Sequence, residues 1–161
     1  MAKIKLYLDT NMVLDLFINQ AKALKGNSDV IEPKKFTFML DHLDKFDFVT
    51  SVLTKAEIVR ELVTAFQLSN IEVERLWEGF SKSLNCNYID KFTVNNKLVD
   101  IVSKIKLRLR TLMNFQHVFI AIQENAYFVS GDKDIINKIR DTDVYDRALT
   151  CIELRELATK L

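Results

Sequence analysis

Hydrophobic positions along the chain switch between the period of a strand and the period of a helix. A strand is predicted at residues 3–8, where KIKLYL alternates and then becomes apolar, and a helix at 11–18, where apolar residues recur at helical spacing. Strands are also predicted at 46–51 and 127–130, with a further candidate at 86–89. Because helical patterns separate these strands, the sequence predicts an α/β fold with a parallel sheet covered on both faces.

The remaining helices are predicted from amphipathic spacing and from cap residues. They are expected at residues 34–45, 54–66, 70–84, 95–110, 114–124, 134–139 and 150–160. The segment 95–110 is mixed, because LVDIV has helical spacing whereas KIKLRLR alternates like a strand, and we interpret it as helix. Ser69 or Asn70 is expected to cap the helix at 70–84. Thr150 and Glu153 have the spacing of a capping box.

Composition is that of an ordinary globular domain, with 161 residues of which 48% are hydrophobic and 28% charged. Gly26 and Pro33 bracket one flexible connection rather than a domain boundary, so residues 1–161 are expected to form a single domain. Cys86 and Cys151 are too few for a disulfide framework or a zinc site. The short apolar stretch at the amino terminus, and the lack of any apolar run near the roughly 20 residues of a membrane span, predict a cytoplasmic protein.

Acidic residues fall where the predicted strands end. Asp9 follows the first strand, and Asp132 and Asp134 follow the strand at 127–130. Glu57 lies in the first turn of a helix that follows another strand. Parallel strands place their carboxyl ends at one edge of the sheet, where ligands bind in open α/β folds. These four acids are therefore expected to converge on one pocket.

Such a cluster of acids predicts a bound cation. Two unit charges about 4 Å apart repel by about 4 kcal/mol at an effective dielectric of about 20, so like charges need compensation. Oxygen ligands without a neighbouring His or Cys favour Mg²⁺ or Mn²⁺ over zinc. Ions of this kind polarise phosphodiesters and generate hydroxide from bound water. The acids therefore indicate nuclease chemistry.

Four segments carry a resemblance to a known family. They are LYLDTNMVLDLF at 6–17, SVLTKAEIVREL at 51–62, NFQHVFIAI at 114–122 and YFVSGDKDI at 127–135. In this order they resemble the four motifs of the PIN domain, a family that includes the VapC-type toxins of toxin–antitoxin pairs. The resemblance implies a three-layer α/β/α domain that acts as a metal-dependent endoribonuclease and leaves 3′-hydroxyl and 5′-phosphate ends. It also implies RNA as substrate, an antitoxin protein as partner and a homodimer.

The family's motifs can be placed on this sequence residue by residue. Its first acid falls on Asp9, its second on Glu57, and the acid of its fourth motif on Asp132. The implied metal ligands are Asp9, Glu57, Asp132 and Asp134, with Asn11 and Ser130 as supporting polar residues. The implied catalytic residues are Asp9, Glu57, Asp132 and the residue at the family's third acidic position, Asn114.

The third acidic position departs from the family pattern. In the family an Asp commonly precedes a His by three residues, and His117 puts that position at Asn114, whereas another register would put it at Gln116. We prefer Asn114, because the preceding LRTLM also resembles the family's approach to that Asp. Asn lacks the negative charge of Asp, so metal affinity should fall. Three interpretations stay open: an active natural variant, an inactive domain that still binds RNA or a protein, and a deliberate inactivating substitution.

Ordinary structural roles compete with these assignments. Thr54 and Glu57 have the spacing of a capping box, and Asp132 and Asn114 are residue types that commonly cap helices. His117 and His42 are assigned no catalytic role. A basic strip, formed by Lys104, Lys106, Arg108 and Arg110, either contacts phosphates or is a solvated face.

Alternative functions can be compared with the same sequence features. The net charge of +1 gives no global sign of nucleic-acid binding. GDKD faintly resembles a motif of haloacid-dehalogenase-like phosphatases, but those enzymes need an Asp where this chain has Asn11. A Rossmann cofactor domain would need glycines after the first strand. A metal-dependent endoribonuclease is therefore the leading hypothesis, and a non-catalytic PIN module that binds RNA or protein is the second.

Overall fold

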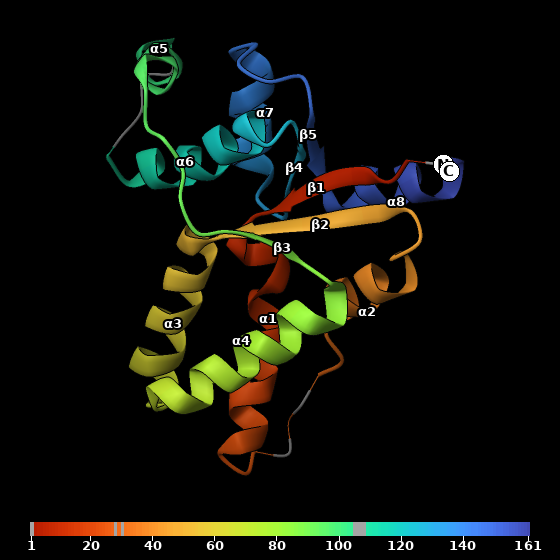
Figure 1. The fold of residues 1–161 in the computed structure, drawn as a ribbon, viewed down its shortest axis with the longest axis vertical. Coiled ribbons are helices and arrows are strands. Elements are labelled where there is room, and N and C mark those ends of the chain that lie inside the picture. Colours follow the sequence, from red (N-terminus) through yellow and green to blue (C-terminus); the bar gives the residue numbers. More distant parts are fainter. Residues whose placement is uncertain (1, 28, 30, 105–108) are drawn as a thin grey trace.

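Figure 1 shows the fold as a computed structural model, which describes residues 2–27, 29, 31–104 and 109–161, with the backbone alone at 109–112. In this part of the chain one sheet contains the parallel strands β1 (Ile4–Leu8), β2 (Phe46–Ser51), β3 (Asn87–Ile89), β4 (Tyr127–Ser130) and β5 (Ala148–Thr150). The helices described are α1 (Thr10–Leu24), α2 (Lys34–Asp41), α3 (Val52–Phe66), α4 (Asn70–Leu84), α5 (Asn96–Lys104), α6 (Leu109–Gln123), α7 (Lys133–Asp141) and α8 (Cys151–Lys160). The predicted α/β fold with a parallel central sheet is confirmed.

The order of the strands places β1 at the centre of the sheet. The order is β3-β2-β1-β4-β5, so the chain builds outward from β1 on one side and then returns to build on the other. In open α/β sheets, ligands bind outside the carboxyl ends of the strands where the order reverses, which here is between β1 and β4. Leu8 pairs with Val129, and the Asp9 N–H donates to the Val129 carbonyl at 3.0 Å. The segments that follow β1 and β4 therefore leave the sheet side by side.

Helices cover both faces of the sheet because the strand side chains alternate. Leu6 and Leu8 of β1 pack in a core with α1, α2, α3, α4 and α8, whereas Tyr7 packs in a second core with α6 and α7. Figure 1 shows α1 to α4 on one side of the strands and α6 and α7 on the other. This arrangement agrees with the predicted three-layer α/β/α architecture.

Some predicted helix starts are confirmed and others are wrong. Ser69 and Thr150 each form a capping box at the start of their helices, α4 and α8. The Thr54–Glu57 capping box, which competes with a metal role for Glu57, is not formed, because α3 begins at Val52 and Ser51 accepts the Leu53 N–H at 3.2 Å. Glu57 is therefore free of a capping role.

The structure also differs from the predicted elements between α5 and the end of the chain. Asn114 does not cap a helix, because α6 begins at Leu109. Of the helix predicted at 95–110, α5 accounts for Asn96–Lys104, and residues 105–108 lie outside those described. The strand β5 was not predicted; it contains only three residues at the edge of the sheet. Within the described ranges, no helix has the length and apolar character needed to cross a membrane.

The packing of α1 against α4 holds the helix that follows Asp9. Phe17 of α1 is fully buried, with its ring centroid 5.9 Å from that of Trp77 and 5.3 Å from that of Phe80. We expect Phe17→Ala to lower the free energy of unfolding by about 3–5 kcal/mol, measured by urea denaturation. Leu24→Ala, in the same helix at a side chain 54% exposed, is the control and should cost about 0.5 kcal/mol or less. Equal losses would contradict this account of the core.

Candidate active site

A buried carboxylate joins the ends of β1 and β4. The Asp9 side chain is 8% exposed. Its Oδ2 accepts hydrogen bonds from Ser130 Oγ at 2.6 Å and from Asn11 Nδ2 at 2.8 Å. Its Oδ1 accepts the backbone N–H of Thr10 at 2.8 Å. The two strand ends that surround the switch point of the sheet are therefore linked through one acid.

The loop after β4 is fitted closely around the Asn11 amide. Asn11 Oδ1 accepts the Gly131 N–H at 2.7 Å, and Asn11 Nδ2 donates to Ser130 Oγ at 2.9 Å. A Cβ atom at Gly131 would lie 3.2 Å from Asn11 Oδ1, so a larger residue there would push the amide away. The Asp132 N–H donates to Ser130 Oγ at 3.0 Å, and Asp132 Oδ1 caps α7 by accepting the Asp134 N–H at 2.9 Å.

Glu57 approaches the same end of β1 from α3. Its Oε2 accepts a hydrogen bond from Thr10 Oγ1, and Thr10 directly follows Asp9. The same oxygen lies 3.3 Å from His117 Nε2 on α6. That nitrogen is buried and, among the described residues, has no hydrogen bond of good geometry. Glu57 is therefore held between a helix from each layer, close to Asp9.

A buried hydrogen-bond chain lies behind His117. The Tyr7 hydroxyl is 2.8 Å from His117 Nδ1 and 2.6 Å from Ser51 Oγ, and all three side chains are almost fully buried. Burial raises the pKa of Tyr7 well above its ordinary value, although the hydrogen bond with Ser51 opposes this. Tyr7 therefore keeps its proton, and its hydroxyl links His117 Nδ1 to Ser51 Oγ. The other imidazole nitrogen, Nε2, faces Glu57.

The two carboxyl groups have pKa values shifted in opposite directions. Burial raises the pKa of Asp9; the electrostatic effect of nearby His117 and the hydrogen bond from Ser130 oppose the shift, and the Glu57 charge adds to it. Burial would also raise the pKa of Glu57, but His117 and Thr10 together hold it below its ordinary value. A cation beside Asp9 would offset the cost of its buried charge.

The other predicted site residues make no direct side-chain hydrogen bond with Asp9 among the described residues. Asp132 is the exposed N-cap of α7, and Asp134 is exposed in its first turn. No hydrogen bond or ion pair of the Asp134 carboxylate is found among the described residues. Asn114 is half-buried on α6, three residues before His117. The structure thus brings Asp9, Asn11 and Ser130 into direct contact. Glu57 is linked to them through Thr10, and Asp132 through its backbone N–H.

Asp9 and Glu57 are the acids that remain as candidate ligands of a divalent metal ion. Within the described part of the chain, no three His, Cys, Asp or Glu side chains stand close enough together to hold a metal ion. The predicted convergence of four acids is therefore not found there. Mg²⁺, however, is commonly bound through one or two carboxylates, with water and substrate phosphates completing its shell. Asp9 and Glu57 supply hard oxygen donors of this kind.

Sequence reasoning missed the residues that position the two acids. Tyr7 lies in an apolar strand and Ser51 at a helix start, so neither position signals a buried network. His117 was assigned no catalytic role, and the structure gives it a contact with Glu57. Lys35 of α2 was also missed; its Nζ donates to the Asn11 carbonyl at 2.8 Å and lies 3.3 Å from Asp15 Oδ2.

The predicted basic strip is largely outside what the structure describes. Lys106 and Arg108 fall among residues 105–108, and Arg110 is described by its backbone alone. Lys104 is exposed at the end of α5.

Comparison with models of known protein families finds no match for this chain, and comparison with curated proteins finds none either.

Removing the Tyr7 hydroxyl tests the buried chain. Tyr7→Phe leaves His117 Nδ1 and Ser51 Oγ without their shared partner, so we expect a loss of about 1–3 kcal/mol in the free energy of unfolding, measured by urea denaturation. Tyr88→Phe is the matched control, because no hydrogen bond of the half-buried Tyr88 hydroxyl is found among the described residues. The same small change in both variants would show that the chain does not stabilise the fold.

Proposed function

We propose that this protein is a Mg²⁺- or Mn²⁺-dependent endoribonuclease of the PIN type that hydrolyses RNA phosphodiesters with water. The observation that supports this most directly is the Asp9 carboxylate, bonded to Ser130 and Asn11 at the switch point of the sheet, with Glu57 held beside it. By the family resemblance, the proposal extends to a toxin that works with an antitoxin partner and assembles as a homodimer in the cytoplasm.

Each residue of the site has a distinct part in this proposal. Asp9 and Glu57 would hold the ion through their carboxylate oxygens, and the exposed Asp132 would act on its water shell. The ion, when bound, would polarise the phosphodiester and lower the pKa of the attacking water. Asn11 and Ser130 keep Asp9 in one orientation by donating to its Oδ2. Thr10 holds Glu57 by donating to its Oε2, and His117 Nε2 lies 3.3 Å from the same oxygen.

Asn114 is the residue that limits the proposed activity. An Asp at this position would add one negative charge on α6, a turn before the His117 that contacts Glu57. With Asn there, fewer charges attract the cation, so metal affinity and rate should both be reduced. The proposal is therefore of a weak enzyme whose activity an additional carboxylate would raise.

Restoring the acid tests this directly. We expect the protein to cleave single-stranded RNA with Mn²⁺, and Asn114→Asp to raise the rate on the order of tenfold, as expected when a metal site regains a ligating or supporting group. Gln116→Glu adds the same charge in the other register of the motif and is the matched comparison. Asp9→Ala should abolish cleavage. If no RNA is cut by the native protein or by Asn114→Asp, the enzyme proposal fails.

A second candidate function is a non-catalytic module that binds RNA or a protein partner. Two observations favour it: Asn stands at the third acidic position, and no group of three metal-ligating side chains is found among the described residues. The enzyme and the non-catalytic module would share the same fold and the same hydrogen bonds around Asp9. Metal binding is the property that distinguishes the two proposals.

Metal binding is measured by the melting temperature with and without Mn²⁺. At about 100 times its dissociation constant, an ion that binds only the folded state adds about 2.7 kcal/mol of stability. The enzyme proposal predicts a rise in melting temperature that Glu57→Gln reduces. Asp47→Asn, at a well-exposed acid at the other end of β2, is the control and should keep the full rise. The non-catalytic module predicts no rise in any of the three proteins.

A further inference from the structure

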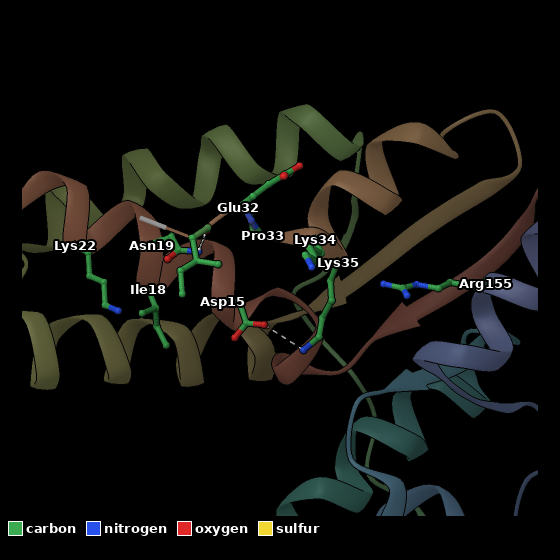
Figure 2. A pocket seen from close by; sticks show the side chains of 10 residues that line it. Asp15, Ile18, Asn19, Lys22, Glu32, Pro33, Lys34, Lys35 and Arg155 are labelled. Carbon is green, nitrogen blue, oxygen red and sulfur yellow. Dashed lines mark hydrogen bonds and ion pairs between the residues drawn. The ribbon is translucent and has the colours of Figure 1, made fainter. Parts of the chain in front are cut away.

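A basic cavity opens beside the candidate active site. It has a volume of about 510 Å³ and lies between α1, the start of α2 and α8, as Figure 2 shows. Its walls contain four basic side chains and two acidic ones, which are Lys22, Lys34, Lys35, Arg155, Asp15 and Glu32. Basic side chains therefore outnumber acidic ones by two in these walls, although the whole chain carries a net charge of only +1.

Lys35 connects this cavity to the carboxylate site. Its Nζ donates to the backbone carbonyl of Asn11, whose side chain holds Asp9. A Cβ atom at Gly131 would lie 3.7 Å from the same Nζ, so the loop after β4 borders the cavity as well. The basic cavity and the two acids are therefore neighbouring parts of one surface.

The charges of the cavity suit a polyanion. Lys35 neutralises Asp15 at 3.3 Å, whereas Lys22, Lys34 and Arg155 take part in no ion pair within the described part of the chain. No side chain caps the start of α2, whose first turn forms part of the wall. In the first turn of α2, however, the Lys34 and Phe36 N–H groups donate to the Glu32 and Pro33 carbonyls, so the basic side chains are the main attraction for an anion.

We propose that this cavity binds the phosphate backbone of the RNA strand as it leaves the cleavage site. The inference rests on the proposed function for its substrate and adds the path that the strand follows. Figure 2 shows Lys22 at one end of the cavity and Arg155 at the other, with Lys34 and Lys35 between them. Basic groups spread in this way over three helices match a linear series of phosphates better than a single anion. The place beside Asn11 and Gly131 puts that series next to the scissile bond.

The test measures binding rather than cleavage. A labelled single-stranded RNA is titrated in the presence of EDTA, which prevents metal-dependent hydrolysis, and fluorescence anisotropy is recorded over a range of salt concentrations. The variant Lys34→Gln/Arg155→Gln removes two exposed charges from the cavity without touching Lys35. We expect the slope of log K against log salt to become shallower by about 1.4, since each phosphate contact to a single strand contributes about 0.7.

The control removes the same charge from the opposite layer. Lys97→Gln/Lys138→Gln changes two exposed lysines on α5 and α7 and should leave the slope unchanged. The inference is overturned if both double variants alter binding equally, or if polyglutamate displaces the RNA as well as unlabelled RNA does, which would indicate an acidic protein partner. If the cavity variant shows the expected shallower slope but the native protein cuts no RNA, the nuclease proposal alone is refuted. Cleavage by a protein whose cavity variant binds normally would refute this inference alone.

Discussion

The candidate site depends on one buried charge at the junction of β1 and β4. Asp9 accepts hydrogen bonds from Thr10, Asn11 and Ser130, two of them from its own side of the junction and one from the other. A buried carboxylate without such donors would be neutral, and burial does raise its pKa. The pairing of the two strands and the charge of the acid therefore support each other. A shift in strand register would remove the Ser130 donor and leave the acid harder to ionise.

Glu57 extends this dependence across both layers of helices. It lies on α3, which packs on one face of the sheet, and it contacts His117, which belongs to the core on the other face. Tyr7 of the central strand fixes the imidazole through Nδ1. Because one tyrosine, one histidine and one glutamate connect the two cores, the orientation of the second acid reflects the packing of the whole domain. Local changes of packing in either layer should therefore alter the orientation of the Glu57 carboxylate.

The sequence predicted what depends on local patterns and missed what depends on tertiary contacts. Alternating strand and helix periods gave the α/β class, and the positions of Asp9 and Asn11 after the first strand gave the polar centre of the site. The edge strand β5 was missed because three residues carry almost no periodicity. The Thr54–Glu57 box, the alternative interpretation of Glu57, is not formed because Ser51, three residues earlier, satisfies the helix start. The role of His117 needs Tyr7 and Glu57 around it, and nothing in its own sequence neighbourhood shows them.

The basic cavity answers a difficulty that any carboxylate site for nucleic acid has to meet. A phosphate that approaches two acids is repelled, by about 4 kcal/mol for one pair of unit charges about 4 Å apart at a dielectric of about 20. A metal ion can reverse this repulsion only at its own position. Phosphates further along the strand need other cations, and Lys22, Lys34 and Arg155 line the cavity that Lys35 connects to Asn11. The net charge of +1 conceals this arrangement, because attraction depends on where the charges lie and not on their sum.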